Sequence, residues 1–257
     1  MLGKTNNKGL KSQPNYTVHL YDHCPFCLRV ELLMGHAGLD YERVVHGYGA
    51  GAPDGAPGYN RTGGPVALTG HKMLPVLQGD NLPPLKEGYK GMPESLEVCA
   101  FLMGEHKLQI PCDAGRGDLS KWQKRFKPLH TNLTRPRMIK MDVVDWQQPT
   151  DVEYAKWKYT TKFNFDYSEA EAKTADDIAA MNEILLELEG LIKGPPTGPD
   201  DTYSLNPWGF SMDDVKLLPN LRNLTCVAGL AWPPIVRAYV EGNFAKCKAD
   251  TYFSQAC

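Results

Sequence analysis

Residues 17–33, TVHLYDHCPFCLRVELL, decide the fold of this chain of 257 residues. Apolar and polar residues alternate over 17–21, which is typical of a short buried strand. From residue 24 the pattern predicts a helix to about residue 38, with Leu28 and Leu32 on its apolar face. The stretch therefore predicts a strand that leads directly into a helix, with two cysteines at the junction.

The two cysteines, Cys24 and Cys27, are predicted to form a redox pair. Attack on a disulfide requires a thiolate, and the positive N-terminal end of a helix stabilises an anion. Cys24 stands at the predicted cap and is the expected attacking thiol, while Cys27 lies one turn inward, within reach of a mixed disulfide on Cys24. Pro25 suits the first helical position because it has no N–H to lose. The alternatives are half of a metal site or inert core thiols.

The elements that follow extend this start into a sheet. Residues 41–46 predict a second strand, which makes β-α-β with a crossover long enough for parallel pairing. Residues 73–78 and 84–90 predict a hairpin, and a helix is predicted from Ser95 to about residue 106. This order is the thioredoxin arrangement, so we expect an α/β thioredoxin-like N-terminal domain over residues 16–107.

Two further motifs in this domain are candidate binding elements. A cis bond between Leu74 and Pro75 would leave the Leu74 N–H and C=O free to pair with an extended peptide. Glu94 and Ser95 stand at a helix start, where free N–H groups and a hydroxyl bind a carboxylate and the Glu side chain pairs with an ammonium. The alternatives are an ordinary trans Leu-Pro bond and ordinary helix capping.

Three segments are predicted to lack regular structure. Residues 1–15 are polar without an apolar core, so we expect a disordered tail and no secretory signal, with organelle targeting as the alternative. Residues 47–70 are rich in Gly and Pro, and we expect a flexible surface loop that contributes little to the core. Residues 108–117 are predicted to be a linker.

The rest of the chain, residues 118–257, is predicted to be an all-helical domain. Apolar residues recur at helical spacing in two stripes, one of Trp122, Phe126, Leu129 and Leu133, the other of Ile178, Met181, Leu185, Leu188 and Ile192. Thr174 and Ser211 are each followed three residues later by an aspartate, a pattern that predicts two N-caps.

Composition limits the classes of function. The net charge of −2 gives no field that would attract nucleic acid or an anionic membrane, and no apolar stretch reaches the length of a membrane helix. The 7 cysteines include a single close pair, unlike a secreted disulfide scaffold, and neither a second CxxC nor a matching His pair completes a zinc site. We expect a cytoplasmic monomer without metal, nucleic-acid or membrane partners.

Four runs together resemble the glutaredoxin 2 family, large bacterial glutaredoxins with a glutathione-transferase-like architecture: YDHCPFCLRV (21–30), MLPVLQ (73–78), MPESLEV (92–98) and MDDVKLLPNLRNLTCVAGLAWP (212–233). The resemblance covers roughly residues 16–245. It implies a glutaredoxin domain packed on an all-helical domain, with glutathione as co-substrate and disulfide-bonded or glutathionylated proteins as partners.

The resemblance also implies roles for individual residues. Cys24 would form the mixed disulfide with glutathione, and Cys27 would resolve protein disulfides. The remaining implied contacts are all with glutathione: the backbone of Leu74 behind a cis Pro75 with its cysteinyl part, Glu94 and Ser95 with its γ-glutamyl end, and Lys72 with its glycyl carboxylate.

Two other classes of function remain open from the sequence. An omega-like glutathione transferase shares this architecture and a cysteine, but it requires an open apolar second site between the domains. A non-enzymatic transferase-like binding protein, as in the chloride intracellular channels, resembles the chain around the CPxC run. The sequence assigns no role to Cys112, Cys226, Cys247 and Cys257.

Overall fold

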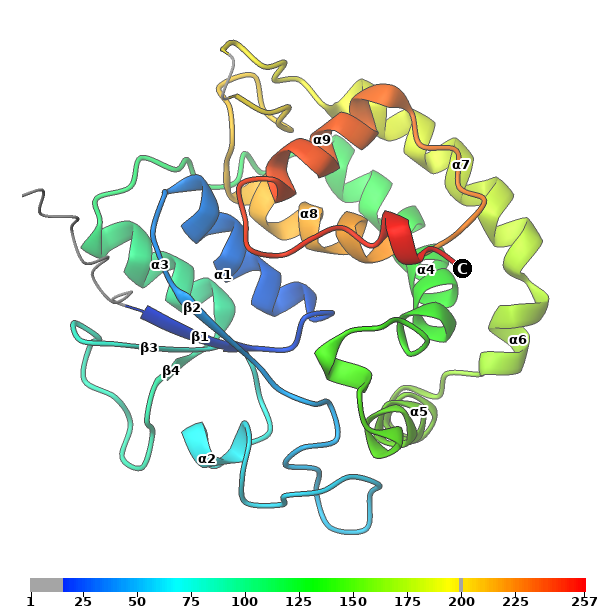
Figure 1. Ribbon diagram of the computed structural model, residues 1–257. Coiled ribbons are helices and arrows are strands. Elements are labelled where there is room, and N and C mark those ends of the chain that lie inside the picture. Colours follow the sequence, from blue (N-terminus) through cyan, green and yellow to red (C-terminus); the bar gives the residue numbers. More distant parts are fainter. Residues whose placement is uncertain (1–15, 199–200) are drawn as a thin grey trace, which may run out of the picture.

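The computed structural model describes residues 16–198 and 201–257. The tail predicted over residues 1–15 lies outside the described residues. A small sheet with helices packed on it forms the first part of the chain, and a larger group of helices forms the rest (Figure 1). The predicted architecture, an α/β thioredoxin-like part followed by an all-α part, is confirmed.

The sheet holds four strands in the order β2-β1-β3-β4. Their bounds are β1 (Tyr16–Leu20), β2 (Glu42–Val45), β3 (Val76–Gly79) and β4 (Met92–Pro93). β2 pairs parallel with β1, as a β-α-β crossover requires, and β3 pairs antiparallel with both β1 and β4. β1 is therefore central, and its C-terminal end leads straight to the two cysteines.

The predicted strand over residues 84–90 is wrong. These residues form turns and irregular backbone, and only Met92 and Pro93 pair with β3. Gly88 has a φ of 82°, a left-handed conformation that no strand residue adopts, and consecutive prolines at 83 and 84 remove two backbone donors.

Helix α1 (Pro25–His36) is buried on two sides. Val30, Leu33 and Met34 pack in the core of the sheet half, together with residues of α3 (Ser95–Glu105). Leu28 and Leu32 belong to the core of the helical half. A helix that is apolar all round is expected where it is covered from both sides. α1 therefore lies between the sheet and the later helices.

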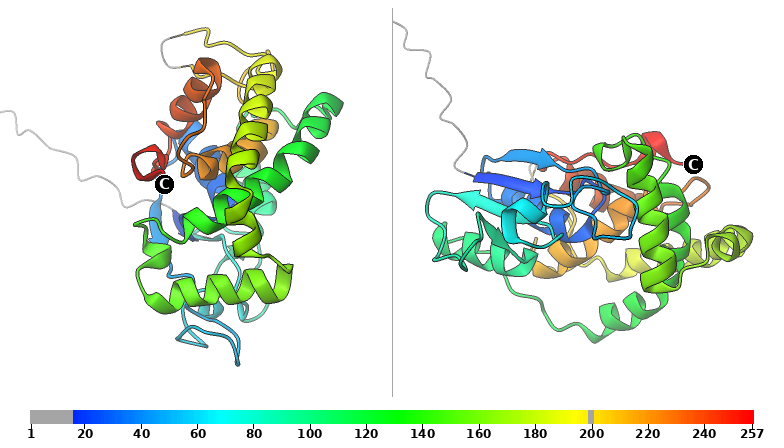
Figure 2. Two further views of the ribbon diagram at one scale, coloured as in Figure 1. Left: turned by 90° about the vertical axis from the view of Figure 1, so that its right-hand side faces the viewer. Right: turned by 90° about the horizontal axis from the view of Figure 1, so that it is seen from below.

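The helical half packs around α4 and α7, which run side by side (Figure 2). Its elements are α4 (Gly117–Met138), the 3₁₀ helix η1 (Val144–Trp146), α5 (Pro149–Phe163), α6 (Tyr167–Ala172), α7 (Thr174–Leu191), α8 (Met212–Leu224), α9 (Pro234–Phe244) and the 3₁₀ helix η2 (Phe253–Gln255). Both predicted apolar stripes face the shared core, where most of their members are buried and Leu129, Ile178 and Ile192 are partly buried. The Trp122 indole N–H also donates to the Ile184 carbonyl over 2.8 Å.

One of the two predicted N-caps is confirmed. Ser211 caps α8 in a capping box with Asp214. The cap predicted at Thr174 is wrong, because α6 ends only two residues earlier and Lys173 serves as the boundary of both helices. Thr174 is already helical, and its hydroxyl donates to the Ala170 carbonyl.

The segment over residues 47–70 is packed, contrary to the expectation that it contributes little to the core. Several of its residues are buried, and Tyr48, Ala52 and Ala56 join the core of the helical half. The Gly49 N–H donates to the Asp151 carboxylate at the start of α5 over 2.7 Å. A Cβ on Gly58 would lie 2.5 Å from the Gly49 carbonyl oxygen. The small residues allow close backbone packing, and the short helix α2 (Val66–Thr69) closes the segment.

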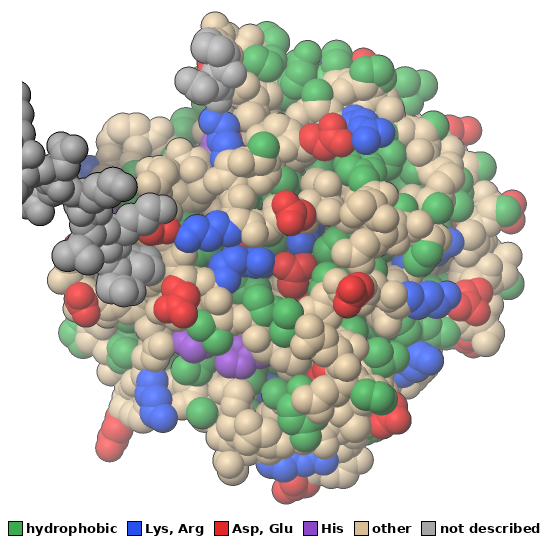
Figure 3. All heavy atoms as spheres, viewed as in Figure 1, with side chains coloured by type: hydrophobic (Ala, Val, Ile, Leu, Met, Phe, Trp, Pro, Cys, Tyr) green, Lys and Arg blue, Asp and Glu red, His purple; other side chains and the backbone are tan. Residues whose placement is uncertain are grey.

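The connection between the two halves is tied to the start of α8. The Met212 N–H donates to the Pro111 carbonyl over 3.0 Å, and the Ala114 N–H donates to the Asp213 carboxylate over 3.0 Å. On the face in Figure 3, acidic and basic side chains are interspersed. Among the described residues, no helix combines the length and apolar character needed to span a bilayer.

Candidate active site

Cys24 is the N-cap of α1, and Pro25 occupies the first helical position, as predicted. The Cys24 backbone is extended, with φ −74° and ψ 118°, and its carbonyl accepts the first helical hydrogen bond from the Leu28 N–H. Cys24 is partly exposed and Cys27 is fully buried. The junction therefore presents one thiol outward at the positive end of a helix and holds the second one turn inside.

The surroundings make the Cys24 thiol acidic. A hydrogen bond from the Cys27 thiol lowers the pKa of Cys24 to about 7, assisted by the His23 ring and by the backbone N–H groups of Phe26 and Cys27, while burial acts in the opposite direction. Burial, reinforced by the neighbouring Cys24, raises the pKa of Cys27 well above its usual value. At neutral pH Cys24 is the thiol that supplies thiolate.

A buried carboxylate from the helical half holds the loop before Cys24. Asp145, in η1, accepts the Asp22 N–H over 2.8 Å and the His23 N–H over 2.7 Å. The same carboxylate contacts the His23 ring Nδ1. Asp145 is fully buried, so these contacts are made in a poorly solvated environment where charge-assisted hydrogen bonds are strong.

Two residues of α8 also bind the loop before Cys24. Arg222 donates to the Asp22 carbonyl over 2.6 Å and to the Asp22 carboxylate over 2.8 Å. The Asn223 side chain donates to the His23 carbonyl over 2.8 Å. All these polar contacts join the helical half to the residues immediately before Cys24, so the position of the thiol depends on both halves.

The Leu74–Pro75 peptide bond is cis, as expected, and it immediately precedes β3. Leu74 lines a pocket of about 390 Å³ together with Cys24 and Lys72. Within the described part of the chain, the Leu74 N–H and C=O have no hydrogen-bond partner. The edge predicted to accept an extended peptide is therefore present and open beside the thiol.

Glu94 and Ser95 stand at the start of α3 but do not line this pocket. Glu94 is exposed and has a φ of 72°, a left-handed conformation that is rare for residues other than glycine and is enriched at binding sites. Ser95 is buried, with its hydroxyl 3.5 Å from the Arg29 guanidinium. Arg29 also lies over the exposed Phe26 ring and so links this helix start to α1.

The Lys72 ammonium reaches the pocket, and protein groups occupy its three donors. It donates to the Tyr21 hydroxyl over 2.9 Å and to the Tyr48 and Ala50 carbonyls, each over 2.5 Å. Burial lowers the pKa of Lys72 to about 7, and the nearby Lys158 ammonium acts in the same direction. Lys72 thus fastens the segment over residues 47–70 next to Cys24.

Sequence reasoning missed the far wall of the pocket, which the helical half provides. Lys158, on α5, donates to the Tyr48 hydroxyl over 3.0 Å. Burial lowers the pKa of Lys158, whereas the negative charge of Cys24 acts to raise it. Further along α4 and α5 the wall includes His130, Arg135 and Phe163. No local motif marks these residues, because the signal is their proximity to Cys24 in space.

The described residues contain no cluster of three or more His, Cys, Asp or Glu side chains arranged as metal ligands would be. The arrangement consists of an acidic thiol at a helix start, a buried partner thiol, an open backbone edge and a pocket between the two halves. Chemically, it is suited to exchange of thiols and disulfides.

Comparisons with known proteins agree with this chemistry. A family model described as "Glutaredoxin 2, C terminal domain" matches residues 118–256. Glutaredoxin 2 of Escherichia coli strain K12 is 26% identical over 238 residues, which cover 89% of this chain and 94% of that protein. The crystal structure of glutaredoxin 2 from Salmonella typhimurium in complex with glutathione is similar in fold, with a TM-score of 0.78 at 24% identity, over 95% of this chain and 100% of that one.

Proposed function

Because the chain belongs to the glutaredoxin 2 family, whose C-terminal domain model matches residues 118–256, we propose that it reduces protein disulfides and glutathione mixed disulfides with Cys24 as the attacking thiolate. Cys27 is the resolving thiol, and glutathione is the co-substrate. The observation that carries this assignment is the contrast between a partly exposed Cys24, whose pKa is lowered to about 7, and a buried Cys27, whose pKa is raised.

Reduction of a protein disulfide uses both thiols. The Cys24 thiolate attacks one substrate sulfur, a mixed disulfide forms, and the other substrate sulfur leaves as a thiolate. Cys27 loses its proton and attacks the Cys24 sulfur, which closes the Cys24–Cys27 disulfide and releases the second substrate thiolate. One glutathione thiolate then opens this disulfide at Cys24, and a second removes the bound glutathione as glutathione disulfide. Two glutathione molecules thereby supply the two electrons.

Removal of glutathione from a protein requires only Cys24. Its thiolate attacks the glutathione sulfur of the mixed disulfide, and the protein cysteine leaves as a thiolate. A second glutathione attacks the same sulfur, forms glutathione disulfide and regenerates the Cys24 thiolate. Because the leaving group in this last step is Cys24 itself, a low pKa of Cys24 speeds regeneration.

We place glutathione along the open edge at Leu74, where the backbone N–H and C=O pair with its cysteinyl part beside Cys24. Support comes from the glutathione complex of the Salmonella relative and from the unpaired Leu74 backbone next to a cis Pro75. Glu94 and Ser95 at the start of α3 bind the γ-glutamyl end. Lys72, whose donors hold the Tyr48 and Ala50 carbonyls, attracts the glycyl carboxylate through its charge.

Single-cysteine variants test the division of roles. Cys24→Ser should abolish reduction of both a protein disulfide and a glutathionylated peptide. Cys27→Ser should retain much of the activity on the glutathionylated peptide and lose reduction of the protein disulfide. Cys112→Ser, which removes an exposed thiol far from the motif, is the control and should change neither. Equal loss of both activities in Cys27→Ser would contradict the assigned roles.

The pocket between the halves also favours a second candidate function, transfer of glutathione to an apolar electrophile. Aromatic side chains of Phe26, Tyr159 and Phe163 line it beside Cys24. Hydroxyethyl disulfide reduction and chlorodinitrobenzene conjugation, measured on the same preparation, separate the two. We expect disulfide reduction to dominate, and dominant conjugation would favour the transferase.

A further inference from the structure

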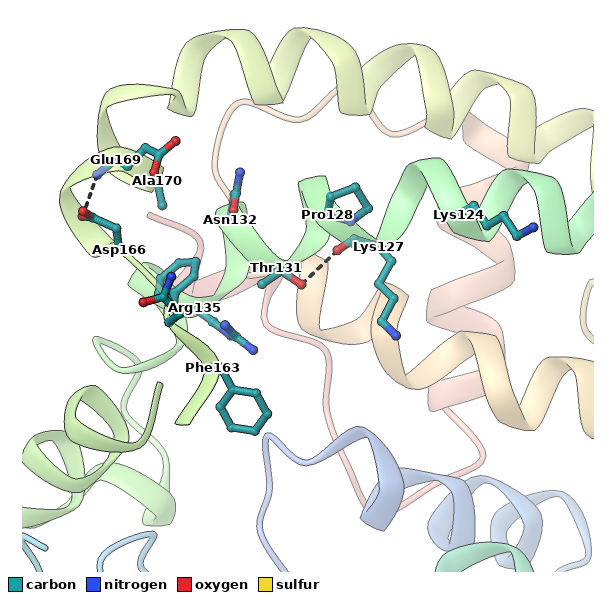
Figure 4. A pocket seen from close by; sticks show the side chains of 12 residues that line it. Lys124, Lys127, Pro128, Thr131, Asn132, Arg135, Phe163, Asp166, Glu169 and Ala170 are labelled. Carbon is teal, nitrogen blue, oxygen red and sulfur yellow. Dashed lines mark hydrogen bonds between the residues drawn. The ribbon is translucent and has the colours of Figure 1, made fainter. Parts of the chain in front are cut away.

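A second cavity, of about 580 Å³, lies along α4 and the connection between α5 and α6. Figure 4 shows Lys124, Lys127 and Thr131 following one another along α4, with Asp166 on the facing segment. None of these residues belongs to the CxxC motif or to the elements assigned to glutathione. We call this cavity the α4 groove.

The α4 groove adjoins the Cys24 pocket. Thr131, Arg135 and Phe163 line both cavities. Phe163, at the end of α5, is 56% exposed and projects toward the ribbon of α1 in Figure 4. A molecule bound in the groove therefore lies next to the pocket of the attacking thiol.

The α4 wall of the groove carries positive charge that the protein does not neutralise. Within residues 16–198 and 201–257, neither Lys124 nor Lys127 forms an ion pair. The Arg135 guanidinium lies over three aromatic rings, those of Tyr159, Phe163 and Phe165, at 4.5, 5.3 and 4.8 Å from their centroids, and pairs with no described carboxylate. Such cations are available to an anionic partner.

The acidic residues of the facing wall are already engaged. Asp166 caps α6 by accepting the Glu169 N–H over 3.0 Å. Glu169 itself pairs with Lys173 over 2.6 Å. Neither carboxylate lies within ion-pair distance of Lys124 or Lys127. The acidic residues of the facing wall therefore neutralise the positive charge of the α4 wall only in part.

The length of the basic wall indicates what kind of molecule fits it. Lys124 and Arg135 are separated by about 16 Å along α4, at roughly 1.5 Å per helical residue. An extended peptide rises roughly 3.3 Å per residue, so about five residues span this distance. A small anion could bridge the neighbouring Lys124 and Lys127 but would not reach from Lys124 to Arg135, whereas an extended segment would contact all three cations.

We propose that the α4 groove binds an extended acidic segment, about five residues long, that flanks the reactive cysteine of the protein substrate. The proposal rests on the proposed function, because the segment is delivered with the disulfide that Cys24 attacks. Complementary charges at an exposed groove chiefly accelerate association and select between substrates.

Two glutathionylated peptides test this on the unmodified protein. They share the same central cysteine and differ only in five flanking residues on each side, rich in Asp and Glu in one and in Lys and Arg in the other. We expect kcat/KM at low ionic strength to be about five- to tenfold higher for the acidic peptide, and the preference to shrink with added salt. Equal kcat/KM for the two peptides would overturn the proposal without any variant.

A variant with two reversed charges then tests whether the peptide preference arises in the α4 groove. Lys124→Glu with Lys127→Glu should remove or invert the preference for the acidic peptide. The matched control is Lys90→Glu with Lys156→Glu, which changes two exposed lysines outside both cavities by the same charge. An equal loss of preference in the control pair would overturn the assignment to the α4 groove.

Hydroxyethyl disulfide, which has no flanking residues, separates this proposal from the function on which it rests. The Lys124 and Lys127 variant should reduce it as fast as the unmodified protein, which also shows that the variant folds. Failure of the unmodified protein to reduce it would refute the proposed function. Normal reduction of it with no peptide preference would refute only the groove.

Discussion

Asp145 affects the active-site thiol from a part of the chain more than a hundred positions away. Its buried carboxylate accepts the N–H groups of Asp22 and His23 and contacts the His23 ring. The His23 ring in turn helps to lower the pKa of Cys24. Asp145 is therefore a positioning residue, which acts on the thiol through the loop and the ring that it holds.

Asp145→Asn tests this role. The amide is nearly isosteric but uncharged, so the loop loses its strongest acceptor and the His23 ring loses the carboxylate that orients it. We expect the midpoint of Cys24 alkylation to move to higher pH, and kcat/KM for hydroxyethyl disulfide to fall several-fold at pH 6.5 and much less at pH 9. Asp142→Asn, at an exposed neighbouring position, is the control. An unchanged pH profile in Asp145→Asn would contradict the role.

At the residue scale, the sequence predicted the site residues that belong to a short motif and missed those that come from distant parts of the chain. Cys24, Cys27 and the Leu74–Pro75 pair could be identified because their chemistry follows from a motif a few residues long and its place beside a strand. Asp145, Lys158 and Arg222 could not, because each is an ordinary charged residue on a helix until the fold brings it to the thiol.

At the scale of an element, the segment over residues 47–70 differs from the prediction made from its composition. Its Gly and Pro content suggested a mobile loop, yet the same small residues allow its backbone to pack against itself and against α5. Composition indicates how much side chain a segment can bury, but it does not show whether two backbones approach closely. Apolar periodicity was a better guide, because both predicted helical stripes are in the core.

Two glycine substitutions measure that packing. Gly58 and Gly55 both have positive φ, at 125° and 80°, so alanine is strained at either position. Only at Gly58 would a Cβ meet other atoms, 2.5 Å from the Gly49 carbonyl oxygen, whereas the space around Gly55 is open. We expect Gly58→Ala to lower the free energy of unfolding by about 2 kcal/mol more than Gly55→Ala.

Urea unfolding of both glycine variants gives the comparison. Alanine is strained by the positive φ at both positions and meets the Gly49 backbone at Gly58 alone, so a larger loss at Gly58 is the result expected if the segment is packed. Equal losses in the free energy of unfolding would mean that the segment does not pack as described and is a loose surface loop.

Across the whole molecule, the two halves share the residues next to the active site. The Asp22 carboxylate accepts hydrogen bonds from Arg43 in the sheet half and from Arg222 and Tyr252 in the helical half. Burial would raise the pKa of Asp22, but the Arg222 guanidinium and these hydrogen bonds hold it well below its usual value. Fold class followed from the order of predicted elements, whereas this interface depends on side chains that no periodicity reveals.

Arg222→Met tests the interface. Removing one partner of a buried ion pair costs about 3–5 kcal/mol when the other charge is left unpaired; the Asp22 carboxylate keeps Arg43 and Tyr252, so the lower end of this range applies. We expect a loss of that order in the free energy of unfolding at pH 7, together with a higher pH midpoint of Cys24 alkylation. Arg125→Met, which breaks the exposed pair with Glu187, should change stability by less than about 1 kcal/mol.

The pH dependence of stability follows from the same pair. Because the pKa of Asp22 is depressed in the folded state, the unfolded chain takes up the proton first on acidification, and the stabilisation is lost progressively as the pH falls from about 4 toward the lower pKa of the folded state. This part of the acid sensitivity should be reduced in Arg222→Met, where only Arg43 and Tyr252 still lower the pKa of Asp22. Parallel acid profiles for the variant and the unmodified protein would show that the pair does not couple the halves.

The most direct test of the account is the rate at which each cysteine is alkylated as a function of pH. Reduced protein treated briefly with iodoacetamide and mapped by mass spectrometry reports all the thiols in one experiment. We predict that Cys24 reacts fastest, with a midpoint near its pKa of about 7, while the buried Cys27 stays largely unmodified. Preferential labelling at pH 6 of the exposed Cys112 or Cys257 would contradict the claim that Cys24 is the activated thiolate.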